Sequence, residues 1–278
     1  MKKKRKWSTF MLLLFFFIGL SVMLYPAISS YWNSKTQSKA IVNYEKMISS
    51  IPPADYTALF SEAERYNEEL SSLQFPLMEY GKLNGYNDIL DVSGTGMFGY
   101  ITIDTIGIEL PIYHGTDNGV LSTAVGHIEG TSIPVGGKGT HSVLSAHRGL
   151  PTATLFTHLD HLEVGDIFEI TILDRTMTYQ VDQIKTVDPS DTSDLLINEE
   201  ESYCTLVTCT PYGINTHRLL VRGRQISSAQ EKKIYITSDA HKIDTLIVTP
   251  VVALPILLTL MTVVLCKPVK KDDLGDEL

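Results

Sequence analysis

The chain has 278 residues, of which 44% are hydrophobic and 20% are charged. This length is typical of one large domain or two small ones, and this composition excludes intrinsic disorder and a fibrous repeat. The formal net charge is −9, and residues 10–266 carry 15 bases against 28 acids, a net charge of −13. A nucleic-acid binder needs a basic face to neutralise phosphates. That class of protein is therefore excluded.

Two uncharged, mostly apolar runs lie near the ends of the chain. The first, residues 7–28, follows the basic residues 2–6, and the second, residues 245–266, is followed at once by a lysine-rich segment. Each run is long enough to cross the hydrocarbon core of a membrane as a helix. Because lysines flank the outer end of each run, the positive-inside rule predicts two spans, both termini in the cytoplasm and residues 31–243 outside.

A cleaved signal peptide is the alternative interpretation of the first run. Phe10–Leu24 has the length of a signal-peptide core, and Ala27-Ile-Ser29 offers small residues for cleavage. The second run would still hold the protein on the membrane. Its two prolines, Pro250 and Pro255, do not exclude a helix, because kinks are tolerated in membrane spans.

The outside part begins with a helical pattern and continues with strand patterns. Leu59, Ala63, Tyr66 and Leu70 form one stripe at helical spacing, and Pro52-Pro53 just upstream is typical of a helix start. From residue 97 onward, short β-branched runs alternate with turn residues, which predicts an all-β barrel or sandwich. The runs are 99–114, 141–146, 167–173, 177–187, 204–210 and 218–225. Short helical turns are expected at 126–131 and 154–162.

The chain has three cysteines, an odd number for an exported protein, which indicates a free thiol. Cys266 ends the second apolar run and cannot pair across a membrane. On a strand, Cys204 and Cys209 would face opposite sides and lie roughly 16 Å apart, whereas a disulfide needs Cα atoms within about 7 Å. Both thiols are therefore expected to be free, and one of them is a candidate for reactivity.

Cys209, His147 and Arg218 are the parts of a thiol acyl-transfer site. A thiolate is a nucleophile whose population rises beside a cationic neighbour. A histidine can protonate a departing amine and later deprotonate an incoming one. An arginine offers fixed donors to the oxyanion that forms on the attacked carbonyl group, or holds the substrate backbone.

The motifs that carry these residues resemble those of the sortase family, and more narrowly of the class C (pilin-polymerising) sortases. The signature Thr-Leu-x-Thr-Cys is present as Thr205-Leu-Val-Thr-Cys209, the histidine motif as His147-Arg-Gly149 and the arginine strand as Thr216-His-Arg218. The resemblance runs from about residue 44 to residue 225, and the paired apolar runs also match class C.

The resemblance implies a role for each residue. Cys209 would be the nucleophile, His147 the acid/base and Arg218 the oxyanion or substrate-positioning residue, while Thr208 would help to hold the substrate threonine. The implied fold is an eight-stranded sortase β-barrel with an N-terminal helical extension. The implied reaction cleaves a Leu-Pro-x-Thr-Gly-type sorting signal of a pilin or surface protein after Thr, and a lysine amine of another pilin then resolves the thioacyl-enzyme into an isopeptide bond. No metal or cofactor is implied.

Other interpretations of these residues stay open at this stage. Cys204 is read as a core residue, His141 shares a strand face with His147 and could replace it, and Arg222 and Arg224 compete with Arg218 by spacing alone. Arg148 is expected to be solvated or salt-bridged. For the whole protein the alternatives are attachment of proteins to cell-wall peptide, hydrolysis of the thioester, and a catalytically inactive anchored assembly module.

One departure from class C lies in the segment before the barrel. Class C members commonly carry a lid loop with an Asp-Pro-aromatic motif, but residues 71–90 contain no Asp-Pro, and Phe75-Pro76 is the nearest similar pair. A more open site is therefore expected.

The predicted organisation is a basic tip and first span, a helical extension with a lid-region loop, the barrel domain, a linker, a second span and a cytoplasmic tail. Their bounds are 1–30, 31–96, 97–228, 229–243, 244–266 and 267–278.

Overall fold

The computed structural model describes residues 2–227 together with Pro255 and Thr259. The predicted linker, the second span apart from those two residues, the cytoplasmic tail and Cys266 lie outside the described residues. Within the described part, the chain divides after Ala27 into two units. The second of these units, which begins at Ile28, holds the barrel and all the candidate site residues.

The first helix, α1, runs without a break from Lys2 to Ile48 and contains Pro26. Its stretch Phe10–Ile48 is long and apolar enough to cross a membrane, with a mean hydropathy of 2.3 over its most apolar 18 residues. It is the one such helix in the described part of the chain. A signal sequence has the same length and composition, so cleavage remains an alternative.

The second helix, α2, covers Pro53–Ser71 and begins with a proline in its first turn, as predicted. Its apolar stripe faces the core, because Ala63, Tyr66 and Leu70 are buried. The helix is fixed by a pair of hydrogen bonds between the Asn67 amide and the backbone of Ile133, of 2.9 and 2.8 Å. The short elements α3 (Pro76–Glu79), η1 (Tyr80–Lys82) and η2 (Tyr86–Asp88) follow.

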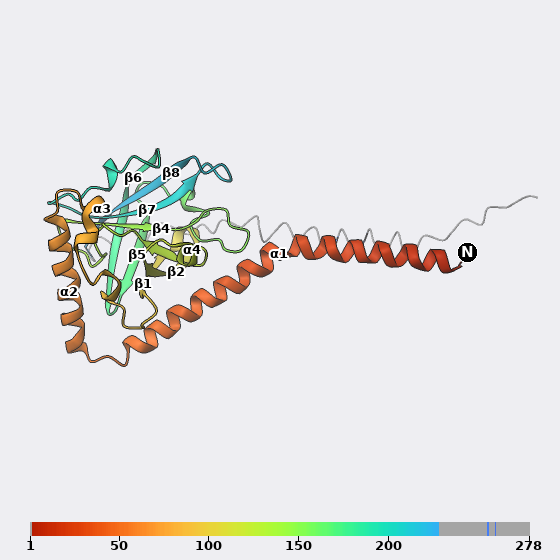
Figure 1. Ribbon diagram of the computed structural model, residues 1–278, viewed down its shortest axis with the longest axis horizontal. Coiled ribbons are helices and arrows are strands. Elements are labelled where there is room, and N and C mark those ends of the chain that lie inside the picture. Colours follow the sequence, from red (N-terminus) through yellow and green to blue (C-terminus); the bar gives the residue numbers. More distant parts are fainter. Residues whose placement is uncertain (1, 228–254, 256–258, 260–278) are drawn as a thin grey trace, which may run out of the picture. The chain divides into compact units, whose positions relative to one another are not determined.

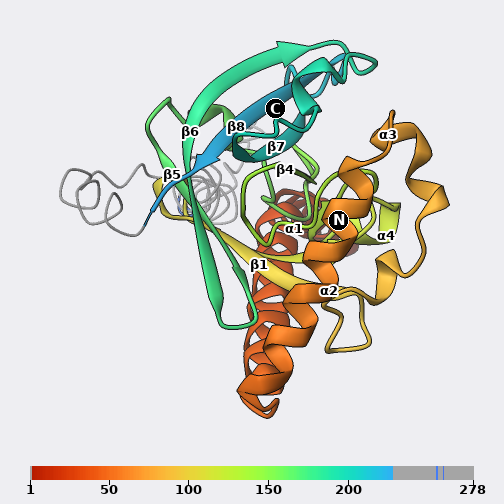
Figure 2. The same ribbon diagram turned by 90° about the vertical axis from the view of Figure 1, so that its left-hand side faces the viewer.

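Eight strands form a closed barrel in the order β1-β2-β3-β4-β7-β8-β6-β5, which confirms the predicted all-β barrel (Figures 1 and 2). The strands are β1 (Met97–Ile103), β2 (Ile108–His114), β3 (Val125–His127), β4 (Thr140–Ser145), β5 (Ile167–Ile172), β6 (Arg175–Val187), β7 (Ser202–Thr210) and β8 (His217–Gln225). The connections contain α4 (Asn118–Leu121), η3 (Asp104–Ile106), η4 (Leu159–His161) and η5 (Ser193–Leu195).

Two sequence-based expectations differ from this structure. The segment 126–131, expected as a helical turn, begins with strand β3, which pairs in parallel with β2 and antiparallel with β4. The strand pattern over 99–114 is split by η3 and by Gly107, whose φ of 63° is a conformation that glycine adopts without steric penalty. The turn expected in 154–162 is present as η4.

Strands β4, β7 and β8 lie side by side and alternate between two faces. Cys204 and Leu206 point into the main barrel core. Val143, Val207 and Leu220 lie on the other face and form a small separate apolar cluster with partly buried Ile128, Val187 and Leu195. Because successive side chains on a strand point to opposite faces, odd-numbered residues of β7 share the face of this small cluster.

Candidate active site

Cys209 lies near the end of β7, Arg218 near the start of β8, and His147 two residues after the end of β4, the strand that pairs with β7 on its other side. Cys209 is the register partner of Arg218 in the antiparallel pair β7–β8. In the parallel pair β4–β7 the last registered partners are Ser145 and Val207. His147 and Cys209 each follow that pair by two residues, and the Thr208 hydroxyl donates to the carbonyl oxygen of Ala146 between them at 2.9 Å. All three residues are only partly buried, so that a ligand can reach them, and the small apolar cluster lies one step further along the same face.

The two described cysteines differ in environment, as their spacing predicts. Both are free. Cys204 is completely buried in the barrel core, and burial raises the pKa of its thiol above the usual range. A buried protonated thiol is a poor nucleophile. Cys209, on the opposite face of β7, is partly exposed. Of the two, only Cys209 is placed to react.

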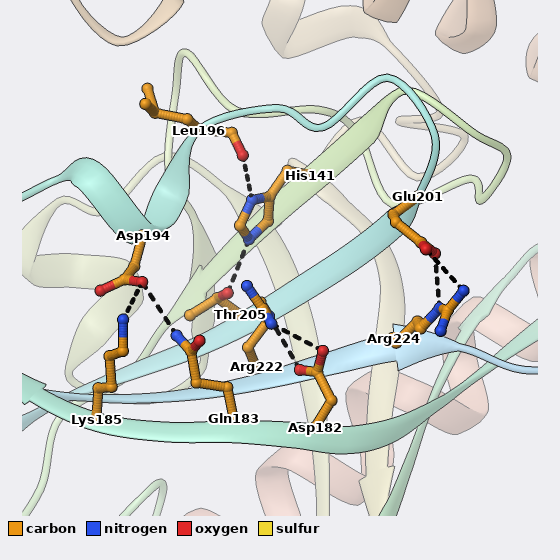
Figure 3. Close-up of polar contacts among 10 residues, drawn as sticks. All are labelled: His141, Asp182, Gln183, Lys185, Asp194, Leu196, Glu201, Thr205, Arg222 and Arg224. Carbon is orange, nitrogen blue, oxygen red and sulfur yellow. Dashed lines mark hydrogen bonds and ion pairs between the residues drawn. The ribbon is translucent and has the colours of Figure 1, made fainter.

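The three arginines of β8 differ in their hydrogen-bond partners. Arg222 makes a two-pronged ion pair with Asp182, with N–O distances of 2.9 and 2.8 Å, and Arg224 pairs with Glu201 at 2.6 Å (Figure 3). Both guanidinium groups are therefore held by carboxylates. Arg218 instead donates to the backbone carbonyl groups of Asn215 and His217, at 3.3 and 3.0 Å.

His141 lies on the same strand as the segment leading to His147, but both of its ring nitrogens are occupied. Nδ1 lies 2.8 Å from the carbonyl oxygen of Leu196, and Nε2 lies 2.8 Å from the hydroxyl oxygen of Thr205 (Figure 3). Burial lowers the pKa of His141, which favours the neutral ring. His141 is therefore a structural residue that joins β4, β7 and the β6–β7 loop.

Thr208, expected to hold the substrate threonine, is 2% exposed. Its hydroxyl group donates a hydrogen bond of 2.9 Å to the carbonyl oxygen of Ala146, and the amide of Ala146 donates to Val207 at 3.2 Å. These bonds fix the segment just before His147 against the segment just before Cys209. The side chain thus faces the neighbouring strand.

The segment after His147 is held by its own hydrogen bonds. The amide of Phe156 donates to the carbonyl oxygen of His147 at 3.2 Å, and the amide of Gly149 donates to the Thr157 hydroxyl at 3.1 Å. The guanidinium of Arg148 pairs with Asp160 in η4. Of the two expectations for Arg148, solvated or salt-bridged, the second is confirmed.

The lid-region segment lies against β3 and the loops on either side of it. The Tyr86 hydroxyl is 2.8 Å from Nδ1 of His127 in β3 and accepts a 3.1 Å hydrogen bond from Gly115. Phe75 is 55% exposed, and the backbone after it passes so close to Gly130 that a Cβ there would lie 2.9 Å from the Cα of Leu77. Within the described chain, no hydrogen bond joins residues 71–90 to the three candidate site residues.

Parts of the chain are similar in sequence to known proteins. Residues 101–226 match the sortase domain family. The chain is 32% identical over 132 residues to sortase D of Bacillus subtilis, covering 46% of this chain and 64% of that protein. It is 30% identical over 142 residues to sortase A of Streptococcus agalactiae, covering 49% and 57%. The matched region thus spans about three fifths of the length of these curated relatives.

Solved structures match over nearly their whole length. Sortase C1 of Streptococcus agalactiae superposes with a TM-score of 0.63 at 46% identity, covering 68% of this chain and 99% of that one. Sortase C of Streptococcus pneumoniae gives a TM-score of 0.61 at 42% identity, covering 68% and 97%. The barrel topology and the sequence identity together define the protein family. The chain belongs to the sortase family, and its structural neighbours are class C sortases.

Proposed function

We propose that the chain is a membrane-anchored cysteine transpeptidase that cleaves Leu-Pro-x-Thr-Gly-type sorting signals between Thr and Gly and joins pilin or surface-protein subunits through isopeptide bonds. The observation that supports this proposal is the strand register, which pairs Cys209 of β7 with Arg218 of β8 and pairs β4 with β7 up to two residues before His147 and Cys209. Membership of the sortase family and a 46% identical class C neighbour support it.

In the first half of the proposed reaction, the thiolate of Cys209 attacks the carbonyl carbon of the signal threonine. The carbonyl π electrons move to the oxygen, and the Arg218 guanidinium donates to the oxyanion that forms. When this intermediate collapses, the bond between carbon and the glycine nitrogen breaks. His147 gives its proton to the departing amine, and a thioester with Cys209 remains.

In the second half, a lysine amine of another subunit attacks the thioester carbon. His147, neutral after the first half, takes a proton from this amine, and the Cys209 thiolate leaves. The product is an amide bond between the threonine and the lysine side chain. Enzyme and protons return to their starting state, so no cofactor or energy source is consumed.

The acceptor distinguishes pilus assembly from the alternatives. Two structural neighbours are described as "Sortase C1 of GBS Pilus Island 1" and "Pilus-related Sortase C of Group B Streptococcus". These descriptions favour a pilin lysine over a cell-wall peptide amine for this chain. Attack by water would make the protein a peptidase, and failure of Cys209 to react would make it an inactive assembly module.

Thr208 enters the proposal through its contact with Ala146. Its buried hydroxyl and the 2.9 Å bond to that carbonyl support a role in holding the histidine and cysteine segments together from behind the site. Direct contact with the substrate threonine would require this 2% exposed side chain to be uncovered. We therefore assign Thr208 a positioning role.

We also propose that the barrel lies outside the membrane with both termini in the cytoplasm. The apolar stretch of α1 supports an N-terminal anchor, and the basic residues 2–6 support its orientation. Protease added outside intact cells should digest the barrel and spare tags placed at either terminus. Digestion of either tag from outside would overturn this topology.

The test of the reaction uses residues 28–241, the unit that carries the barrel, mixed with a Leu-Pro-x-Thr-Gly peptide and observed by intact-protein mass spectrometry. Wild-type protein should gain the mass of the peptide up to its threonine, while Cys209→Ala gains none, and an added pilin fragment with an acceptor lysine should remove the adduct. Transfer to wall peptide alone would favour wall anchoring. The absence of any adduct on folded wild-type protein would favour the inactive module.

A further inference from the structure

Arg148, which directly follows His147, has a side chain that is only 9% exposed. Its Nη2 lies 2.5 Å from a carboxylate oxygen of Asp160, and its Nη1 donates to the hydroxyl oxygen of Thr210 at 3.4 Å. The ring of Tyr212 lies beside the guanidinium, with its centroid 5.9 Å from Cζ. The side chain thus bridges three segments that are far apart in the sequence.

Two of those segments carry the proposed reacting groups. Arg148 is bonded in the chain to His147, and Thr210 is bonded to Cys209. The third, η4 with Asp160, is tied back to His147 because the amide of Phe156 donates to the His147 carbonyl oxygen. One guanidinium therefore links the residue after the acid/base to the side chain of the residue after the nucleophile, and Asp160 holds its other end.

Stability alone does not account for a buried arginine at this position. Its Nε is buried and has no hydrogen-bond partner among the described residues, so they leave one of its donors unpaired. The Asp160 carboxylate is 39% exposed, and an ion pair with one partner in contact with solvent contributes at most about 1 kcal/mol. Arg148 more directly fixes the relative position of the segments that it links, because an arginine presents its donors in a rigid planar fork.

We propose that Arg148, supported by Asp160, is a positioning residue that fixes His147 relative to Cys209. This inference rests on the proposed roles of those two residues. Proton transfer requires the histidine to lie within hydrogen-bond reach of the reacting atoms, and a misplacement of about 1 Å can lower a rate about 100-fold. The side-chain contacts given for Arg148 in the described part of the chain are with Asp160, Thr210 and Tyr212, so we assign it no direct part in the chemistry.

The test compares four single-site variants and one double variant of the full-length protein in detergent, all in a Cys266→Ala background. Arg148→Met keeps the volume and removes the donors, Arg148→Lys keeps the charge, and Asp160→Asn removes the support. Arg222→Gln is the matched control, because it breaks another partly buried arginine–carboxylate pair on the barrel. Thermal unfolding of each variant verifies that it is folded.

Two rates are measured: single-turnover acylation by a Leu-Pro-x-Thr-Gly peptide, and alkylation of Cys209 by iodoacetamide between pH 5 and 9. Arg148→Met and Asp160→Asn should each lower the maximal acylation rate by about 30- to 100-fold, with the half-saturating peptide concentration changed less than about 3-fold. In both variants, the pH dependence of the Cys209 alkylation rate should differ from that of the wild-type protein, and it should shift in the same direction in the two variants. Arg148→Lys should recover part of the rate, and Arg222→Gln should keep wild-type values.

The double variant Arg148→Met/Asp160→Asn should lose no more than either single variant, because both act through one link. Wild-type rate and pH profile in folded Arg148→Met, or an equal loss in Arg222→Gln, would overturn the proposal. If Arg148→Met does not fold, Asp160→Asn decides by the same readouts. If the wild-type protein forms no acyl adduct, the proposed function fails, while the alkylation profiles still decide whether Arg148 positions His147 against Cys209.

Discussion

Cys209 and Arg218 are directly opposite each other on the antiparallel strands β7 and β8. Side chains of such a pair point to the same face, with Cβ atoms about 4.5–5.5 Å apart. The position of the two residues opposite each other is therefore set by the ladder of backbone hydrogen bonds between β7 and β8. A cationic fork next to a sulfur nucleophile is a suitable arrangement for stabilising an oxyanion formed on an attacked carbonyl group.

Replacing Arg218 by lysine should lower the acylation rate by about 100- to 1,000-fold, the usual effect of removing an oxyanion donor. Lysine keeps the charge but loses the fork. Stability should change little, because within the described residues the Arg218 side chain donates to two nearby backbone carbonyl groups, those of Asn215 and His217, and to no carboxylate. Single-turnover acylation and thermal unfolding measure the two quantities. Arg224→Lys, on the same strand, is the control, and an equal loss of rate in that variant would contradict the assignment.

The stability of the protein should fall as the pH falls from about 6.5 towards 4.5. Burial lowers the pKa of His127 to about 4, against about 6.5 in an unfolded chain. Between these values the unfolded state binds a proton that the folded state does not, so the free energy of unfolding rises with pH in this window. The contribution of His127 is complete above about pH 6.5 and amounts to about 3 kcal/mol.

Urea denaturation at several pH values measures this dependence. Burial also lowers the pKa values of His114 and His141, and both add a slope of the same sign. His127→Gln should reduce the slope without removing it. His161→Gln, which changes an exposed histidine, should leave it intact. A free energy of unfolding that stays constant between pH 6.5 and 4.5 would show that these rings do not resist protonation in the folded state.

Much of the barrel and of its site is predictable because period-2 patterns and local motifs are properties of neighbouring residues. The alternation along β7 correctly predicts that Cys204 and Cys209 face opposite sides, and the helical stripe correctly predicts the buried side of α2. The motifs at Cys209, His147 and Arg218 identify the family before any strand pairing is known. Their catalytic roles remain predictions.

What the sequence does not predict depends on pairing between distant segments. Strand β3 has only three residues, too few for an alternating pattern, and it forms through its contacts with β2 and β4. The choice of Arg218 over Arg222 and Arg224 follows from carboxylates at Asp182 and Glu201, which reach β8 from other strands or loops. The link from Arg148 to Asp160 spans an irregular segment with no periodicity to reveal it.

Gly223→Ala should destabilise the barrel strongly. A Cβ at this position in β8 would lie 2.5 Å from a ring carbon of Phe168 and 2.8 Å from the Cβ of Tyr179, both buried in the core. Overpacking of this kind typically lowers the free energy of unfolding by about 1–3 kcal/mol. Gly81→Ala, where no atom lies within 4 Å of the added carbon, is the matched control in denaturant titrations. Equal stabilities of the two variants would refute the close packing of β8 on Phe168.

The second half of α1 should protect the segment that carries His147. Asn33 donates to the carbonyl oxygen of Thr152, and Gln37 donates to that of Thr123, each at 2.7 Å. Both bonds come from one face of the helix and tie down loops of the barrel. A hydrogen bond of this type contributes about 1 kcal/mol, so removing the one from Asn33 should make local opening of the adjoining loop about 5- to 10-fold more frequent.

Hydrogen exchange at the Phe156 amide, which donates to the His147 carbonyl oxygen, reports this opening. Asn33→Ala should speed that exchange by the stated factor, while exchange in the strands stays unchanged. Thr36→Ala is the control on the same helix, because the Thr36 hydroxyl bonds only to the carbonyl oxygen of Trp32 within α1. Unchanged exchange at Phe156 in Asn33→Ala would mean that the segment is held by the barrel alone. The predicted increase would mean that the helix carrying the candidate membrane anchor also steadies the segment that bears the proposed acid/base.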